Sequence, residues 1–109
     1  MEGFKGFAPI VSSVEDYQIQ ENDVFICAKF FNTPGHSPAS ICFLIETNLF
    51  TGDTLLFNQK TILKVPKGSR KDLEESINFL SSLKGYCLRV YPGHGDDFEM
   101  DSYDLGKAL

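Results

Sequence analysis

Several residue types are absent or scarce in this chain. Among its 109 residues tryptophan does not occur, and histidine and methionine occur twice each. No apolar run reaches the roughly 20 residues of a membrane-spanning helix, so we expect no membrane segment. Cysteine occurs three times, an odd number that does not suit a disulfide framework. With no signal peptide at the start, we predict a cytoplasmic protein with buried, reduced thiols at Cys27, Cys42 and Cys87.

Basic residues are also few, which makes negatively charged partners such as nucleic acids unfavourable. Ten basic against 15 acidic residues give a net charge of −5, so the field repels phosphates and we expect no nucleic-acid partner. An acidic run over 96–104 is either a solvated face or a source of a metal ligand, Asp96 or Asp97. Half of the basic residues share one segment, which is either a solvated loop or a patch for a small anionic substrate: Lys60, Lys64, Lys67, Arg70 and Lys71.

The apolar pattern predicts one globular domain of short strands and one helix. Ser69-x-x-Asp72 has the form of a capping box, and Leu73, Ile77, Leu80 and Leu83 follow at helical spacing up to Lys84-Gly85. We predict an extended or loop segment over residues 1–14. Alternating and β-branched runs predict strands, with a tight turn at 47–48, over these ranges: 17–20, 24–31, 41–46, 49–50, 61–65 and 87–91.

Both histidines lie in the same tripeptide. Pro34-Gly35-His36 and Pro92-Gly93-His94 each follow a predicted strand, and Thr51-Gly52-Asp53 follows another. Glycine lets the chain turn sharply at such strand ends. Strands that end on the same edge of a sheet would gather the three polar side chains at one rim, where open α/β sheets bind their ligands. Imidazole and carboxylate donors suit zinc or iron, so the sequence predicts a metal site at His36, Asp53 and His94.

These motifs resemble a known family. The segment Thr33–Cys42, the segment Leu49–Leu55 and Val90-Tyr91-Pro92-Gly93-His94-Gly95 together resemble the metallo-β-lactamase superfamily, especially its glyoxalase II-like hydrolases. The resemblance runs from about Asp23 to Gly95, which corresponds to the second half of the family's domain. It implies an αβ/βα sandwich, of which this chain would form one half: a mixed β-sheet with a helix on one face.

The resemblance also shows what is missing. Members carry an upstream His-x-His-x-Asp-His signature, whereas this chain has no histidine before His36. We therefore interpret residues 1–109 as a single partial domain. By resemblance, His36 would complete a first metal site, Asp53 would bridge two metals, and His94 would belong to the second. The predicted cofactor is zinc, or alternatively iron, in an incomplete site.

Half of a sandwich would leave one sheet face bare. The runs around Phe25, Phe30, Phe31, Phe43 and Leu44 are apolar at alternating positions on both faces, which is typical of strands covered on both sides. We therefore expect a homo-oligomer, or a complementary chain, to cover the second face.

Three functions remain open at this point. The first is a metal-dependent hydrolase of an ester, thioester or related bond that is incomplete and weakly active or inactive as an isolated chain. Thr51 and Thr54 would orient Asp53 in such a site. The second is a degenerate metal-binding or protein-interaction module. The third is one piece of a larger assembly that carries the activity.

Overall fold

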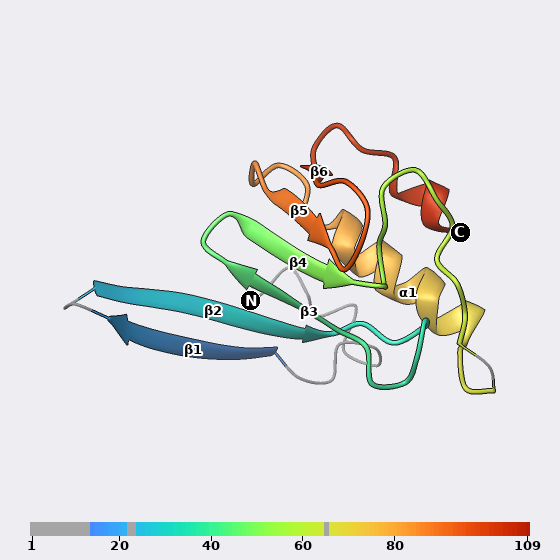
Figure 1. The fold of residues 1–109 in the computed structure, drawn as a ribbon, viewed down its shortest axis with the longest axis horizontal. Coiled ribbons are helices and arrows are strands. Elements are labelled where there is room, and N and C mark those ends of the chain that lie inside the picture. Colours follow the sequence, from blue (N-terminus) through green and yellow to red (C-terminus); the bar gives the residue numbers. More distant parts are fainter. Residues whose placement is uncertain (1–13, 22–23, 65) are drawn as a thin grey trace.

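A single mixed sheet forms the framework of the protein (Figure 1). The computed structural model describes residues 14–21, 24–64 and 66–109, with side chains from Ala28 onward. The predicted loop over residues 1–14 therefore lies almost wholly outside the described residues. Six strands pair in sequence order, namely β1 (Val14–Glu21), β2 (Val24–Asn32), β3 (Ile41–Ile45), β4 (Asn48–Gly52), β5 (Arg89–Pro92) and β6 (Phe98–Glu99).

Helix α1 (Arg70–Ser81) makes the crossover between β4 and β5, the one parallel pair in the described sheet. A parallel pair needs such a connection, whereas the antiparallel neighbours are joined by short loops. As predicted, Ser69 caps the helix: its hydroxyl accepts a hydrogen bond from the Asp72 amide at 3.2 Å. No helix among the described residues has the length and apolarity of a membrane span.

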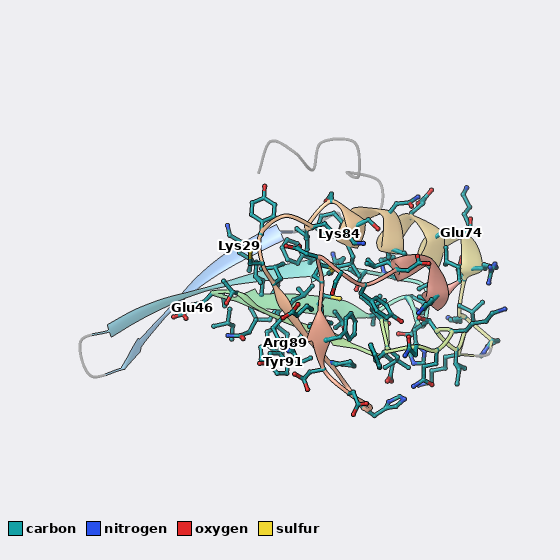
Figure 2. The ribbon with its side chains drawn as sticks, turned by 90° about the horizontal axis from the view of Figure 1, so that it is seen from above. Lys29, Glu46, Glu74, Lys84, Arg89 and Tyr91 are labelled. Atoms are coloured by element: carbon teal, nitrogen blue, oxygen red, sulfur yellow. The ribbon has the colours of Figure 1, made fainter. Side chains whose placement is uncertain are left out.

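The core lies between α1 and one face of the sheet. Phe31, Cys42, Leu49 and Val90 point from four adjacent strands toward the helix and are fully buried. The ring of Phe31 meets that of Phe79 from α1 at a centroid distance of 5.0 Å. Figure 2 shows α1 on this side of the sheet. The predicted mixed sheet with a helix on one face is confirmed.

The opposite face of the sheet carries a row of stacked rings. Phe30, Phe43, Phe50 and Tyr91, here called the aromatic row, occupy neighbouring positions on β2, β3, β4 and β5. Successive ring centroids are 5.5, 4.7 and 5.4 Å apart with interplanar angles of 26°, 15° and 23°. Figure 2 shows Tyr91 on the side away from α1. The strands are therefore apolar on both faces, as the sequence predicts.

The C-terminal segment is more ordered than the acidic run suggests. Strand β6 and the short 3₁₀ helix η2 (Leu105–Ala108) were not predicted from the sequence. The Tyr103 hydroxyl donates to the Leu56 carbonyl at 3.1 Å and accepts from the Asn58 amide at 2.7 Å. Apolar residues between the acidic ones supply the buried side, so the segment packs into the core through Phe98, Met100, Tyr103, Leu105 and Ala108.

Two local predictions are wrong. The hairpin turn lies at Glu46 and Thr47, one residue earlier than expected, because Glu46 takes the left-handed conformation with φ 54°. Residues 61–64 form no strand, and Val65 lies outside the described residues. The Thr61 amide donates to the Ala108 carbonyl in η2 and the Lys64 amide to the His36 carbonyl in a loop, so this segment does not bond to a neighbouring strand.

The cysteines differ from one another. Cys42 is buried as predicted, whereas Cys87 is exposed, which corrects the prediction for that residue. Cys87 precedes β5 with φ 56° and lies outside the core, because the strand begins only at Arg89. The Cys27 side chain lies outside the described residues. Burial raises the pKa of the Cys42 thiol to about 12, against partly compensating hydrogen bonds from Thr33 and Thr54.

We expect Cys87 to react promptly with iodoacetamide and Cys42 to react only as the chain unfolds, because the thiolate is the reactive form. Peptide mass spectrometry over time measures both rates. Equal rates would contradict the burial.

The buried thiol should also make stability depend on pH. Above pH 9 Cys42 loses its proton in the unfolded chain but keeps it in the native protein, so Cys42 lowers the free energy of unfolding as pH rises toward 12.

Candidate metal centre

The topology places three strand ends at one edge of the sheet. β2 is antiparallel to β3, β3 is antiparallel to β4, and β4 is parallel to β5, so β2, β4 and β5 run in the same direction. His36 follows β2, Asp53 follows β4 and His94 follows β5. The three predicted side chains are therefore delivered to a common rim by residues that are far apart in the sequence.

At this rim Asp53 lies between the two imidazoles. Its Oδ2 is 3.5 Å from Nε2 of His36, and its Oδ1 is 3.2 Å from Nδ1 of His94. Together with Leu56 and Ile62, the three residues line a pocket of about 150 Å³. The side chains of His36, Asp53 and His94 are 22%, 45% and 62% exposed, so an ion can reach them from solvent.

A backbone carbonyl holds His36 in place. Nδ1 of His36 lies 2.5 Å from the carbonyl oxygen of Ile62. Because a carbonyl only accepts, Nδ1 carries the proton of this hydrogen bond, which leaves Nε2, the nitrogen facing Asp53, as the one that can bind a metal. Such a bond to the second nitrogen is the usual support for a metal-binding histidine. This role of Ile62 could not be predicted from the sequence, because its carbonyl and not its side chain makes the contact.

Gly35 lets the loop between β2 and β3, here called the first His loop because it carries His36, pack against α1. A Cβ at this position would lie 2.5 Å from the Cα of Leu73, and φ is +146°. The loop is further tied to the helix because the Ser69 amide donates to the Gly35 carbonyl at 2.8 Å and the Ser76 hydroxyl donates to the Pro34 carbonyl at 2.6 Å. The glycine of the first Pro-Gly-His is thus required by a close backbone approach.

A second close approach joins the other two loops. The Gly93 amide donates to the Gly52 carbonyl at 2.8 Å, and a Cβ on Gly93 would lie 3.2 Å from the Gly52 carbonyl carbon. Asp53 and His94 follow these glycines directly. The backbone contact therefore sets the spacing between the carboxylate and the second imidazole.

Behind the rim lies a buried polar cluster. The Thr33 hydroxyl is 3.2 Å from Sγ of Cys42 and 3.3 Å from the Thr54 hydroxyl. The Thr51 hydroxyl donates to the Leu55 carbonyl at 2.8 Å. The prediction that Thr51 and Thr54 orient the Asp53 carboxylate is therefore wrong. The Thr51 hydroxyl instead bonds to the backbone at Leu55 and the Thr54 hydroxyl to Thr33, because each is buried and must find a partner inside the protein.

The donor set fits part of a metal site. Among the side chains that the structure describes, from Ala28 onward without Val65, no group of three from His, Cys, Asp or Glu is arranged to close around a single ion. The geometry explains this, since each imidazole faces a different oxygen of Asp53. Each position would receive one imidazole and one carboxylate oxygen, whereas catalytic zinc has three protein ligands. The set therefore fits two partly built positions that share Asp53.

The acidic alternative is not supported by the contacts of Asp97. Oδ2 of Asp97 accepts a hydrogen bond from Nε of Arg89 at 2.7 Å. This bond lowers the pKa of the Asp97 carboxyl and raises that of the Arg89 guanidinium. Asp97 is thus engaged by Arg89 and does not line the pocket formed around His36, Asp53 and His94.

Comparison with known proteins connects this geometry to metal hydrolases. No protein-family model matches the sequence. A probable metallo-hydrolase of Methanocaldococcus jannaschii is 34% identical over 83 residues, which are 74% of this chain and 40% of that protein. PksB of Bacillus subtilis, a probable zinc-dependent hydrolase of polyketide biosynthesis, is 36% identical over 62 residues, covering 57% of this chain and 28% of that protein.

Solved structures show the same fold. ETHE1 from Myxococcus xanthus matches with a TM-score of 0.67 and 25% identity, over 79% of this chain and 38% of that one. TTHA1623 in a di-iron-bound form gives 0.59 and 33%, over 67% and 37%. The B3 metallo-β-lactamase BLEG-1 gives 0.58 and 27%, over 76% and 40%. The resemblance to the metallo-β-lactamase superfamily is confirmed.

The match concerns one part of the metallo-β-lactamase domain. The chain spans less than half the length of these relatives and solved structures, between 28% and 40%. Its sheet and helix are half of the αβ/βα sandwich, as predicted. Two of its relatives are named as a probable zinc-dependent hydrolase and a probable metallo-hydrolase, and TTHA1623 was solved with two irons bound.

Proposed function

We propose that this chain forms one half of a metal-dependent hydrolase that cleaves an ester, thioester or related bond. The observation that carries the proposal is the arrangement at the rim, where Asp53 lies between two imidazoles, one facing each of its oxygens. A carboxylate placed in this way is suited to be shared between two cations. The relatives support the reaction class, because they are metallo-hydrolases.

In this proposal His36 and Asp53 hold one position, and Asp53 and His94 hold the other. Zinc fits the donors, and iron is the alternative because imidazole and carboxylate bind both. The bound cations would supply Lewis acidity toward the scissile group and make water a better nucleophile. The chain itself fixes the tautomer of His36 through Ile62 and keeps Asp53 near His94 through the contact between Gly52 and Gly93.

The rim also offers a place for a negatively charged part of a substrate. Lys64 and Lys67 line a pocket of about 240 Å³ with Ser37, Pro38 and Pro66. Ser37 follows His36 directly in the chain, so this pocket adjoins the candidate metal centre. We propose that it favours substrates with a carboxylate or a similar anionic group.

Residues 1–109 would then act as a single partial domain whose remaining ligands come from another half. The ligand count supports this, since each position has two protein donors from this chain and catalytic zinc uses three. We further propose a cytoplasmic site of action, because Cys42 and Cys87 are free thiols and such thiols persist in reducing compartments.

The test combines metal content with turnover. We expect purified protein to carry zinc or iron by elemental analysis and to hydrolyse members of a panel of thioesters and esters slowly at best. His94→Ala should lower both metal content and turnover, and Asp97→Ala, outside the rim, is the matched control. A metal-free protein that stays inert with added zinc or iron would favour the second candidate, a degenerate interaction module, which the low ligand count also supports.

A further inference from the structure

Ile62 has two features at the candidate metal centre. Its carbonyl oxygen accepts the hydrogen bond from Nδ1 of His36, and its side chain lines the same pocket as the three candidate ligands. That side chain is 70% exposed, more than any other large apolar side chain that the structure describes. An isoleucine exposed beside metal ligands is in a position to contact a substrate.

The neighbours of Ile62 explain why its side chain points outward. The Thr61 side chain is buried, and its hydroxyl donates to the Thr54 carbonyl at 2.7 Å. Leu63 is partly buried against the core. Since the side chains on both sides of Ile62 face the interior, the Ile62 side chain is left on the pocket side.

Backbone hydrogen bonds fix the chain on both sides of Ile62. The Thr61 amide donates to the Ala108 carbonyl at 2.9 Å, and the Lys64 amide donates to the His36 carbonyl at 2.9 Å. The carbonyl that orients His36 and the side chain in the pocket belong to one residue, so their positions are coupled. A group that is already held in place lowers the entropic cost of binding a ligand.

The wall of the pocket next to the ligands is aliphatic. Leu56 is 2% exposed and Ile62 is 70% exposed, so apolar side chains line the pocket from the interior to the opening. Aliphatic side chains offer no hydrogen bond, so a polar group placed against them would lose its bonds to water. The pocket has a volume of about 150 Å³, which suits a short apolar group.

This pocket must stay open for the proposed reaction. It adjoins both metal positions, because His36, Asp53 and His94 all line it. A catalytic zinc site keeps one position free for water or substrate. Whatever chain supplies the remaining ligands therefore has to leave room here for the group that is attached to the scissile carbonyl.

We infer that Ile62 is a specificity-determining residue that contacts the acyl part of the substrate, and that the substrates are esters or thioesters of short apolar acyl groups. This role rests on the proposed function, which puts the scissile carbonyl at the metal positions. It follows from the exposed aliphatic side chain beside the ligands and from the backbone bonds that fix it.

Carboxylates test this pocket without turnover, because they are the acyl products of ester and thioester hydrolysis. Titrations with acetate and with butanoate in the presence of zinc, followed by NMR of the backbone amides, give both dissociation constants. Butanoate has two more methylene groups and should bind at least roughly fivefold more tightly than acetate. Ile62→Ser should reduce this preference to about twofold or less and leave acetate affinity unchanged.

Ile41→Ser is the matched control. Ile41 is also an exposed isoleucine, but it begins β3 and does not line the pocket. This variant should keep the preference for butanoate. Zinc affinity, measured by calorimetry, should be the same in both variants, because Ile62→Ser keeps the carbonyl that bonds to His36. Circular dichroism should show that both remain folded, since each residue replaced is exposed.

The outcomes separate the role of Ile62 from the function on which it rests. Zinc binding with an unchanged butanoate preference in Ile62→Ser would overturn the inference and leave the proposed function standing. An equal loss of preference in Ile41→Ser would also overturn it. If no zinc binds, the proposed function is contradicted, and titration of the zinc-free protein still shows whether butanoate contacts Ile62 more strongly than acetate does.

Discussion

Asp53→Ala is expected to lower the affinity for zinc at least about 100-fold, since even groups one step behind a ligand cost about 10–100-fold when mutated. Asp53 faces both imidazoles, one with each carboxylate oxygen. Its loss should therefore affect both proposed positions. Competition with a chelator, followed by calorimetry or absorbance, measures the affinity.

The controls make this prediction specific. His94→Ala should reduce affinity at one position and spare the other, so the stoichiometry should fall without reaching zero. Asp97→Ala removes an exposed carboxylate of similar size that is paired with Arg89, and it should leave zinc affinity unchanged. Equal zinc binding by the Asp53→Ala and Asp97→Ala variants would contradict a shared role for Asp53.

Gly35→Ala is expected to lower the free energy of unfolding by about 2–4 kcal/mol. The new Cβ would meet the Leu73 backbone at 2.5 Å, and overpacking costs about 1–3 kcal/mol. The positive φ adds a strain of about 1 kcal/mol or more. Thermal unfolding followed by circular dichroism should show a melting temperature lower by roughly 10–20 °C.

Gly85→Ala separates the two causes. Gly85 also has a positive φ, +98°, but a Cβ there would meet nothing within 4 Å. The control should therefore show the conformational strain without the collision, at about 1–2 kcal/mol. If Gly35→Ala costs no more than Gly85→Ala, the contact between the first His loop and α1 does not stabilise the fold.

The sequence predicted the structure correctly where a motif is seldom found outside one kind of local structure. Two Pro-Gly-His motifs and one Thr-Gly-Asp placed His36, Asp53 and His94 at strand ends, and the structure brings these three side chains together. The cap at Ser69 and the helical spacing after it predicted α1 for the same reason. In both cases a local chemical requirement leaves a visible trace in the sequence.

The misses share a physical cause as well. The carbonyl of Ile62 orients His36, and a backbone group has no side-chain signature. The segment at 61–64 has the composition of a strand, but its amides bond to Ala108 in η2 and to His36 in a loop, both distant in sequence. Phe98 and Met100 are buried among acidic neighbours, so average composition concealed the pattern. Tertiary contacts decided each of these positions.

The parallel pairing of β4 with β5 determines when the candidate metal centre forms during folding. Asp53 and His94 are separated along the chain by the whole crossover, including α1. Pairings between distant segments form late, because the intervening loop must be ordered first. An ion that needs both residues therefore binds the native state and not the unfolded chain, and it should shift the folding equilibrium in proportion to its concentration.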